Sequence, residues 1–283
     1  MKICYLILAH NNPDHFERLI NAISTPNTKV FVHIDSKSTL VEFRKRITQE
    51  NVVFIKKRVS VNWGAFSMVQ ATLNLLSEAL NSKNGCDYYC LLSGVDYPLK
   101  SQIYIENYLK QHYGLEFIST VEIPNKSAEM PLRRIATFYP NIDFYKLFMH
   151  DIKLEVGRWN IKRPYEPIFK DMKPYGGSQF WALTHSAVQY IIEFVAANPE
   201  FVRFFKNTWI PDESFFQTII GNSQFQDQVT GSLTFADWSR NTPPYPAIID
   251  SEHIQYFQEK DDFLIDGIYE TKKTTALCKK IPE

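Results

Sequence analysis

Disulfide bonds are not expected in this chain, because it has few cysteines. Four are present in 283 residues, namely Cys4, Cys86, Cys90 and Cys278, and they are scattered along the sequence. A disulfide framework needs more cysteines at closer spacing. Cys86 and Cys90 have a spacing that a metal site on a helix can use. However, the apolar run around Cys90 is typical of a buried strand, which favours reduced thiols in the core.

An excess of charge of one sign is also missing. The 31 basic residues balance the 31 acidic ones, so the formal net charge is zero. General nucleic-acid binders usually carry a basic excess, and nucleic acid is therefore not an expected partner. The remaining composition, 45% hydrophobic and 22% charged, is that of a globular protein. Aromatic residues make up 14%, which suits core packing and also the aromatic faces of sugar-binding clefts.

No hydrophobic run near the N-terminus is long enough to cross a bilayer. The apolar run at residues 4–9 is six residues long, whereas a transmembrane helix needs about 20. It starts almost at Met1 and lacks the basic lead-in and cleavage site of a secretory signal. We therefore expect a first buried strand there, in a cytoplasmic protein or in a catalytic domain of a longer one.

Several familiar catalytic motifs are absent. The sequence has no Gly-x-Gly-x-x-Gly after its first strand, no Gly-x4-Gly-Lys-Ser/Thr loop and no Gly-x-Ser-x-Gly elbow. These absences argue against a Rossmann dehydrogenase, a P-loop enzyme and an α/β-hydrolase. No Asp-x-Asp triplet, which many nucleotide-sugar enzymes use to hold a divalent metal, and no cluster of metal ligands is evident either, so the sequence shows no sign of a metal or other cofactor.

Short apolar runs alternate with helical patterns along the first 120 residues. This rhythm predicts an α/β fold with a mostly parallel central sheet flanked by helices. Residues 122–175 look irregular, and long excursions of this kind are often functional. The expected strands are 2–9, 29–34, 52–55, 88–92, 116–119 and 178–183, and the expected helices are 14–23, 41–49, 67–80, 102–111, 186–197 and 211–220.

Polar residues follow several of the expected strands. In parallel sheets ligands bind at the carboxyl ends of the strands, which singles out His10 to Asn12, Asp35 to Lys37, Asp96 and Glu122. His10 is equally compatible with helix capping or a place in the core. Asp96 is equally compatible with contacting a ligand and with supporting its own loop.

The segment from Pro211 to Glu213 has two interpretations. Proline suits the first position of a helix, and the acidic Asp212 and Glu213 suit its positive end. A carboxylate at a helix start that faces a cleft can also act as a general base. The local pattern alone does not decide between a well-made helix start and a catalytic residue.

Taken together, the short motifs of this chain resemble glycosyltransferase family 14. That family contains the core-2 β-1,6-N-acetylglucosaminyltransferases and the peptide O-xylosyltransferases. Each motif is weak alone, but their order along the chain is specific. After ILAH at 7–10, the motifs are FVHIDSKS at 31–38, WGAFS at 63–67, LLSGVDYPL at 91–99, GGSQFW at 176–181, PDESFF at 211–216 and DWSR at 237–240.

The resemblance implies a GT-A-type fold and an inverting, metal-independent transfer from a UDP-sugar. It implies one domain over 1–283, with a nucleotide-binding half at 1–120 and an acceptor-binding and catalytic half at 121–283. The family's Pro-Asp-Glu base is Glu213 here. N-acetylglucosamine is the first expectation for the donor sugar and xylose the second. A glycan or lipid-linked glycan is the expected acceptor, as in bacterial polysaccharide synthesis.

The leaving UDP gains negative charge, which cations must stabilise when no metal is present. Arg240 is the first candidate, although it also reads as a surface residue. The second cation that the family places near the end of the chain is absent at 263–267. Lys272 and Lys273 are candidates to replace it. Alternatively, they belong to a basic tail together with Lys279 and Lys280. Such a tail is suited to contact the inner face of a membrane.

Two other functions compete with sugar transfer. One is a non-catalytic nucleotide-sugar or carbohydrate-binding protein on the same fold. The other is a metal-dependent transferase or hydrolase using His10, His33 and scattered carboxylates.

For sugar transfer, the candidate binding residues divide into two groups. The donor-binding candidates are His10, Asp35, Trp63, Gly64, Asp96, Lys272 and Lys273, and the acceptor-binding candidates are Glu122, Arg133, Arg134 and Trp181.

Overall fold

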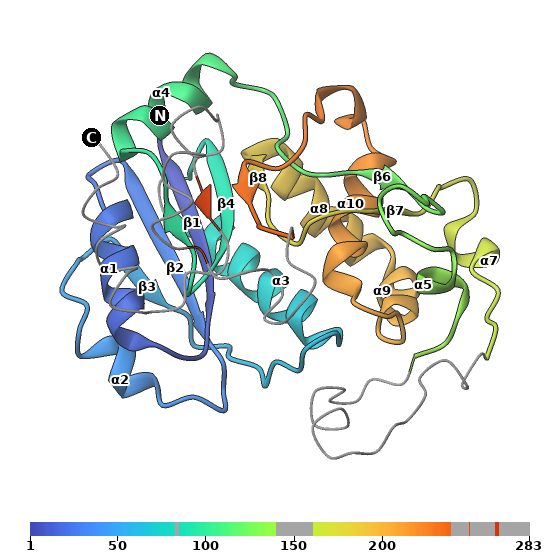
Figure 1. The fold of residues 1–283 in the computed structure, drawn as a ribbon, viewed down its shortest axis with the longest axis horizontal. Coiled ribbons are helices and arrows are strands. Elements are labelled where there is room, and N and C mark those ends of the chain that lie inside the picture. Colours follow the sequence, from blue (N-terminus) through green and yellow to red (C-terminus); the bar gives the residue numbers. More distant parts are fainter. Residues whose placement is uncertain (83–84, 140–160, 239–248, 250–263, 266–283) are drawn as a thin grey trace.

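A five-stranded sheet forms the centre of the first half of the chain in the computed structural model (Figure 1). The structure describes residues 1–82, 85–139, 161–238, 249 and 264–265. The strand order is β3-β2-β1-β4-β8, and every neighbouring pair is parallel except β4 and β8. The strands are β1 (Ile3–Ala9), β2 (Thr28–Ile34), β3 (Val52–Phe54), β4 (Tyr88–Ser93) and β8 (Ala182–Thr184).

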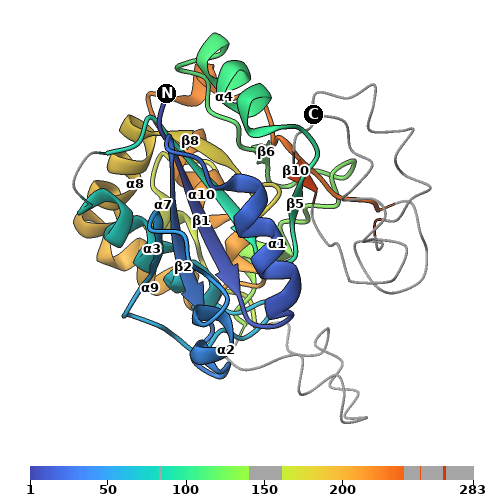
Figure 2. The ribbon, with the colours of Figure 1, turned by 90° about the vertical axis from the view of Figure 1, so that its left-hand side faces the viewer.

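Helices cover both faces of this sheet, so β1 is buried along its whole length. Cys4, Leu6 and Leu8 face one core with α3 (Ser67–Leu80), α8 (His185–Ala197) and α10 (Phe215–Gly221). Ile3, Tyr5, Ile7 and Ala9 face the other core with α1 (Pro13–Ile23) and α4 (Gln102–Gln111). Alternate residues of a strand point to opposite faces, and Figure 2 shows α1 and α3 on opposite sides of the sheet. The predicted α/β fold is confirmed.

The second half of the chain adds shorter elements beside the sheet (Figure 1). Because β8 comes from this half and pairs with β4, both halves share one sheet. Two small sheets join β6 to β7 and β5 to β10 to β9. The remaining elements are α2 (Leu40–Arg44), β5 (Tyr97–Pro98), β6 (Val121–Glu122), α5 (Arg133–Ala136), α7 (Glu166–Phe169), β7 (Tyr175–Gly176), α9 (Pro199–Phe205), the 3-10 helices η2 (Pro211–Glu213) and η3 (Gln226–Gln228), β9 (Thr234–Phe235) and β10 (Leu264–Ile265).

Local sequence signals set several boundaries as predicted. The Asn12 side chain accepts a hydrogen bond of 3.1 Å from the backbone N–H of His15, and Pro13 occupies the first helical position of α1. α3 and α4 span the predicted residues. The thiols of Cys4, Cys86 and Cys90 are buried and free, as expected for core residues. Within the described ranges, no helix has the length and apolarity required to cross a membrane.

Four predicted elements are wrong in extent. The helix expected over 41–49 ends at Arg44. The strand expected over 116–119 consists of single bridges at Glu116 and Phe117, and the strand expected over 178–183 begins only at Ala182. The helix expected over 211–220 is divided into η2 and α10, because Ser214 between them leaves helical geometry with φ −144°.

Glu116 gives the fold a measurable pH dependence. Its carboxylate is 1% exposed and accepts hydrogen bonds from the Thr184 N–H (2.9 Å) and hydroxyl (2.5 Å) at the start of α8. Burial raises the pKa of Glu116 to about 7, and the two hydrogen bonds offset this only partly. The folded pKa lies above the unfolded one, near 4.3. The free energy of unfolding should therefore be greatest below that value and fall as pH rises through 7.

We expect Glu116→Gln to remove the part of the pH dependence of stability that the Glu116 carboxyl group causes. Between pH 4.5 and 8, wild-type stability should fall by about 2 to 3 kcal/mol more than that of the variant. Urea unfolding at a series of pH values measures the difference. If the free energies of unfolding of the two proteins change with pH in the same way, Glu116 is not the source of this pH dependence.

Candidate active site

Three of the sequence motifs meet at η2, which carries Glu213. The backbone N–H of Ile210 donates to the carbonyl of Gly64 in the WGAFS motif at 3.2 Å. The N–H of Gly177 in the GGSQFW motif donates to the carbonyl of Glu213 at 2.9 Å. The backbone of PDESFF is thus held from two sides by segments far away in sequence.

Close backbone approach explains the two glycines beside η2. A Cβ on Gly177 would lie 2.0 Å from the carbonyl oxygen of Ser119. A Cβ on Gly176 would lie 2.9 Å from the Met130 sulfur and 3.3 Å from the Glu213 carbonyl oxygen. No side chain fits at Gly177 without moving the backbone, so the glycines let these segments pack directly around Glu213.

The Glu213 carboxylate pairs with Arg134, which comes from α5. The Arg134 Nη1 and Glu213 Oε2 atoms are 2.5 Å apart. The Glu213 side chain is 28% exposed and that of Arg134 is 16% exposed. A charge-assisted bond of this kind fixes the orientation of the carboxylate. Because Glu213 is only partly covered, it remains accessible to a reacting molecule.

Asp212, directly before Glu213, has a different environment. Burial raises its pKa to about 7, the negative charge of Glu213 adds to that effect, and Arg134 opposes it. Among the described residues, its Oδ1 atom has no hydrogen-bond partner, and neither has the Ser214 hydroxyl or the Gln217 side-chain oxygen. Two adjacent carboxylates therefore differ: Asp212 is enclosed, whereas Glu213 is paired with Arg134 and accessible.

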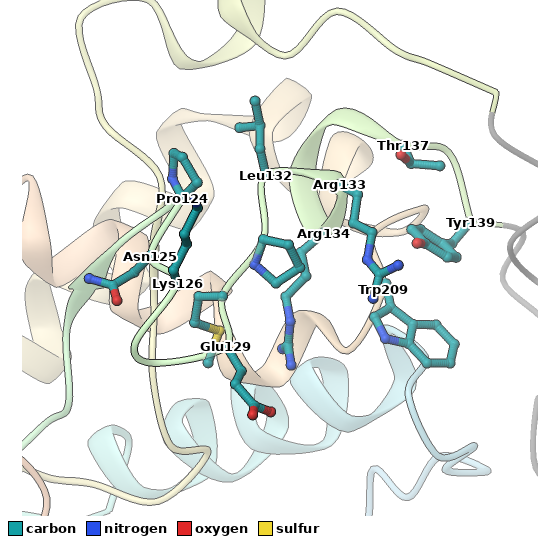
Figure 3. A pocket seen from close by; sticks show the side chains of 12 residues that line it. Pro124, Asn125, Lys126, Glu129, Leu132, Arg133, Arg134, Thr137, Tyr139 and Trp209 are labelled. Atoms are coloured by element: carbon teal, nitrogen blue, oxygen red, sulfur yellow. The ribbon is translucent and has the colours of Figure 1, made fainter.

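A cleft of about 890 Å³ lies beside this ion pair (Figure 3). Arg134 is one of its lining residues, and Tyr139 and Trp209 form an aromatic wall with ring centroids 5.2 Å apart. Trp63 meets Trp209 edge to face at 5.8 Å and is 52% exposed. The cleft is lined by residues 124–126, 129–134, 137, 139 and 209.

The carboxyl end of β2 is a rigid polar turn. The Asp35 carboxylate accepts hydrogen bonds from the N–H groups of Lys37 (2.8 Å) and Val61 (3.2 Å). Arg58 donates to the carbonyls of Ile34, Asp35 and Ser38.

Two cations at this turn, Lys37 and Arg58, are not among the predicted site residues. The Lys37 ammonium lies 3.7 Å from the Asp35 carboxylate. Its place within the FVHIDSKS motif was a usable signal. Arg58 follows two other basic residues, Lys56 and Lys57, and nothing in that run distinguishes it.

Four other predicted residues have distinct environments. His10 is exposed, and its pKa is lowered by partial desolvation, against the effect of Asp35. Asp96 is fully buried, and its carboxylate accepts hydrogen bonds from the N–H and hydroxyl of Ser93, so it stabilises its own turn. Glu122 pairs with Lys173 at 3.1 Å on the surface. Trp181 is 2% exposed and packs against Phe216, which places it in the core and leaves it no face for stacking on a sugar.

Three predicted cations, Arg240, Lys272 and Lys273, lie outside the described residues. Arg133 lines the cleft with Arg134, and Gly64 adopts the left-handed conformation that favours glycine, with φ +71°. In the part of the chain that the structure describes, no group of three or more His, Cys, Asp or Glu side chains is arranged to hold a metal.

Known proteins similar to this chain include N-acetylglucosaminyltransferases. The N-acetyllactosaminide β-1,6-N-acetylglucosaminyl-transferase of Homo sapiens is 28% identical over 244 residues, covering 84% of this chain and 56% of that protein. The β-1,3-galactosyl-O-glycosyl-glycoprotein β-1,6-N-acetylglucosaminyltransferase of Bos taurus is 25% identical over 261 residues, covering 90% and 56%. The chain thus spans about half the length of these relatives.

Among solved structures, the apo form of mouse xyloside xylosyltransferase 1 superposes with a TM-score of 0.41 at 12% identity, covering 94% of this chain and 98% of that one. The family model described as "Branch: Core-2/I-Branching enzyme" matches residues 3–259, which is most of the sequence. This chain therefore belongs to the core-2/I-branching enzyme family of glycosyltransferases.

Proposed function

We propose that this glycosyltransferase moves a sugar from a UDP-sugar to a hydroxyl of a glycan acceptor by a single displacement, with Glu213 as the general base. The acceptor oxygen forms a bond to the anomeric carbon while the bond from that carbon to the UDP oxygen breaks. The acceptor proton passes to Glu213, and UDP leaves with the electron pair. Attack from the side opposite UDP inverts the anomeric configuration.

The observation that carries this proposal is the Arg134–Glu213 pair beside the cleft. The carboxylate is partly exposed, its orientation is fixed by a bond of 2.5 Å, and its partner Arg134 lines a cavity of about 890 Å³. A general base must come within hydrogen-bond reach of the proton that it removes, and a cleft of this volume is typical of sites for small molecules. Asp212 is the less suitable base, because its carboxylate is enclosed.

For the donor, we propose UDP-N-acetylglucosamine first and UDP-xylose second, since the relatives described above are N-acetylglucosaminyltransferases. The absence of an Asp-x-Asp triplet supports transfer without a metal. Positive charge must then come from side chains, and Arg240 remains the proposed partner of the leaving UDP. Lys37, beside the proposed nucleotide contact Asp35, adds a described cation at that end of the sheet.

A thermal-shift series with UDP, UDP-N-acetylglucosamine and UDP-xylose tests the donor assignment. We expect UDP and at least one of the two UDP-sugars to raise the Tm, because a ligand that binds only the folded state stabilises it. The shift should be the same with and without EDTA. A shift that disappears in EDTA and returns with Mn²⁺ would show that a metal takes part. Tight UDP binding without transfer in a broad acceptor screen would instead favour a non-catalytic binding protein.

A further inference from the structure

The lining of the cleft carries positive charge that the described residues do not neutralise. Arg133 and Lys126 both line the cleft, and neither side chain has an ion pair or hydrogen bond with the described part of the chain. Arg134 differs, because Glu213 balances its charge. Among the described residues that line the cleft, Glu129 is the one carboxylate. Within this part of the chain, two cations without an ionic partner therefore face a single acid.

The Tyr139 hydroxyl lies in the field of several arginines. Burial raises the pKa of this hydroxyl, and the positive charges of Arg133, Arg134 and Arg163 oppose that effect. The hydroxyl itself makes no hydrogen bond with any described residue. Figure 3 shows the Arg133 side chain running from α5 toward Tyr139 and Trp209. The Arg133 guanidinium and the Tyr139 O–H thus lie at the same end of the cleft, and neither has a partner among the described residues.

This combination suits an anionic ligand. A guanidinium offers several N–H donors in a planar fork that matches a carboxylate or a phosphate, and the phenol O–H supplies another donor. Arg163 cannot serve in the same way, because its donors are used by the carbonyls of Ile135 and Phe204 and the hydroxyl of Thr208. It adds charge but remains fixed in the protein.

Resting on the sugar transfer proposed above, we propose that Arg133 and Tyr139, beside Trp209, bind an acidic substituent of the acceptor glycan, a carboxylate or a phosphate. The acceptor is thus an anionic glycan, and Arg133 selects it over a neutral one. Hydrogen bonds to charged groups are stronger than those between neutral groups. We accordingly expect about a tenfold preference for a charged over an otherwise identical neutral sugar.

Ligand-observed NMR titrations of the full chain with UDP present test this preference. The probes are methyl β-D-glucoside, methyl β-D-glucuronide and methyl β-D-glucoside 6-phosphate. Wild type should bind one or both charged probes about tenfold more tightly than the neutral one, and 0.5 M NaCl should reduce the ratio. The tighter of the two charged probes identifies the substituent as carboxylate or phosphate.

Substitutions assign the preference to Arg133. Arg133→Gln should lower the charged-to-neutral ratio to about one with neutral binding kept, and Arg133→Lys should keep part of it. Lys110→Gln, at an exposed position in the last turn of α4, is the matched control and should change nothing. Equal affinities for all three probes, no binding of either charged probe, or an unchanged ratio in Arg133→Gln would each overturn the proposal. The UDP-induced Tm shift tests the donor side separately, so failure of this proposal and failure of the proposed function are distinguishable.

Discussion

Glu213→Gln should reduce the rate of sugar transfer by about 10²- to 10⁴-fold, the contribution typical of a positioned general base. The amide has nearly the same shape as the carboxylate but does not accept the acceptor proton. The UDP-induced Tm shift should stay close to the wild-type value, because donor binding does not require the base. Steady-state UDP release with a saturating acceptor measures the loss.

Two controls separate lost chemistry from lost structure. Glu78→Gln changes an exposed carboxylate near the end of α3 and should leave the rate unchanged. Arg134→Gln removes the partner that orients Glu213 and should give a smaller loss than Glu213→Gln itself. If Glu213→Gln keeps near-normal turnover and folds normally, another residue is the base.

Arg163→Met should lower the free energy of unfolding by about 3 kcal/mol, because buried carbonyls lose their donors. The Arg163 guanidinium donates to the carbonyls of Ile135 and Phe204 at 2.9 Å each and to the Thr208 hydroxyl at 2.6 Å. It also lies 3.6 Å from the centre of the Phe204 ring. Burial lowers the pKa of Arg163 to about 10, still well above neutral pH.

These bonds connect α5, which carries Arg134, to the end of α9 and the segment leading to Glu213. Arg163 is therefore a positioning residue for the ion pair, and Arg163→Met should also lower kcat. Arg163→Lys should recover part of the stability, since a single ammonium cannot reproduce the fork. Urea unfolding gives the comparison. Arg203→Met is the control, at a side chain that is 71% exposed and pairs with Glu200, where the expected change is within about 0.5 kcal/mol.

Periodic apolar patterns made much of the fold predictable. Residues 67–80 have helical spacing and form α3 over those residues, and the apolar run near the N-terminus forms the central strand β1. The ends of helices and strands were less predictable where backbone geometry, rather than the apolar pattern, determines them. Ser214 interrupts the helix expected over 211–220, although the residues on both sides read as helical.

The candidate site was predictable as a set of motifs but not as a set of contacts. Glu213 and Arg134 lie 79 residues apart, and no local pattern indicates that they pair. Trp181 was predicted to stack on a sugar because it lies near two glycines, yet it lies directly before β8 and is buried. Trp209 and Tyr139 were not singled out, since an aromatic residue in a loop has no sequence signal that distinguishes a cleft wall from core packing.

The product of the reaction tests the central claim most directly. Proton NMR can follow UDP-N-acetylglucosamine and a glycan acceptor in EDTA with the wild-type chain and with Glu213→Gln. We expect the α-anomeric donor signal to decrease while a β-linked product and UDP appear in equal amounts, and we expect almost no product from the variant. An α-linked product, or equal rates from the two proteins, would contradict a single displacement with Glu213 as the base.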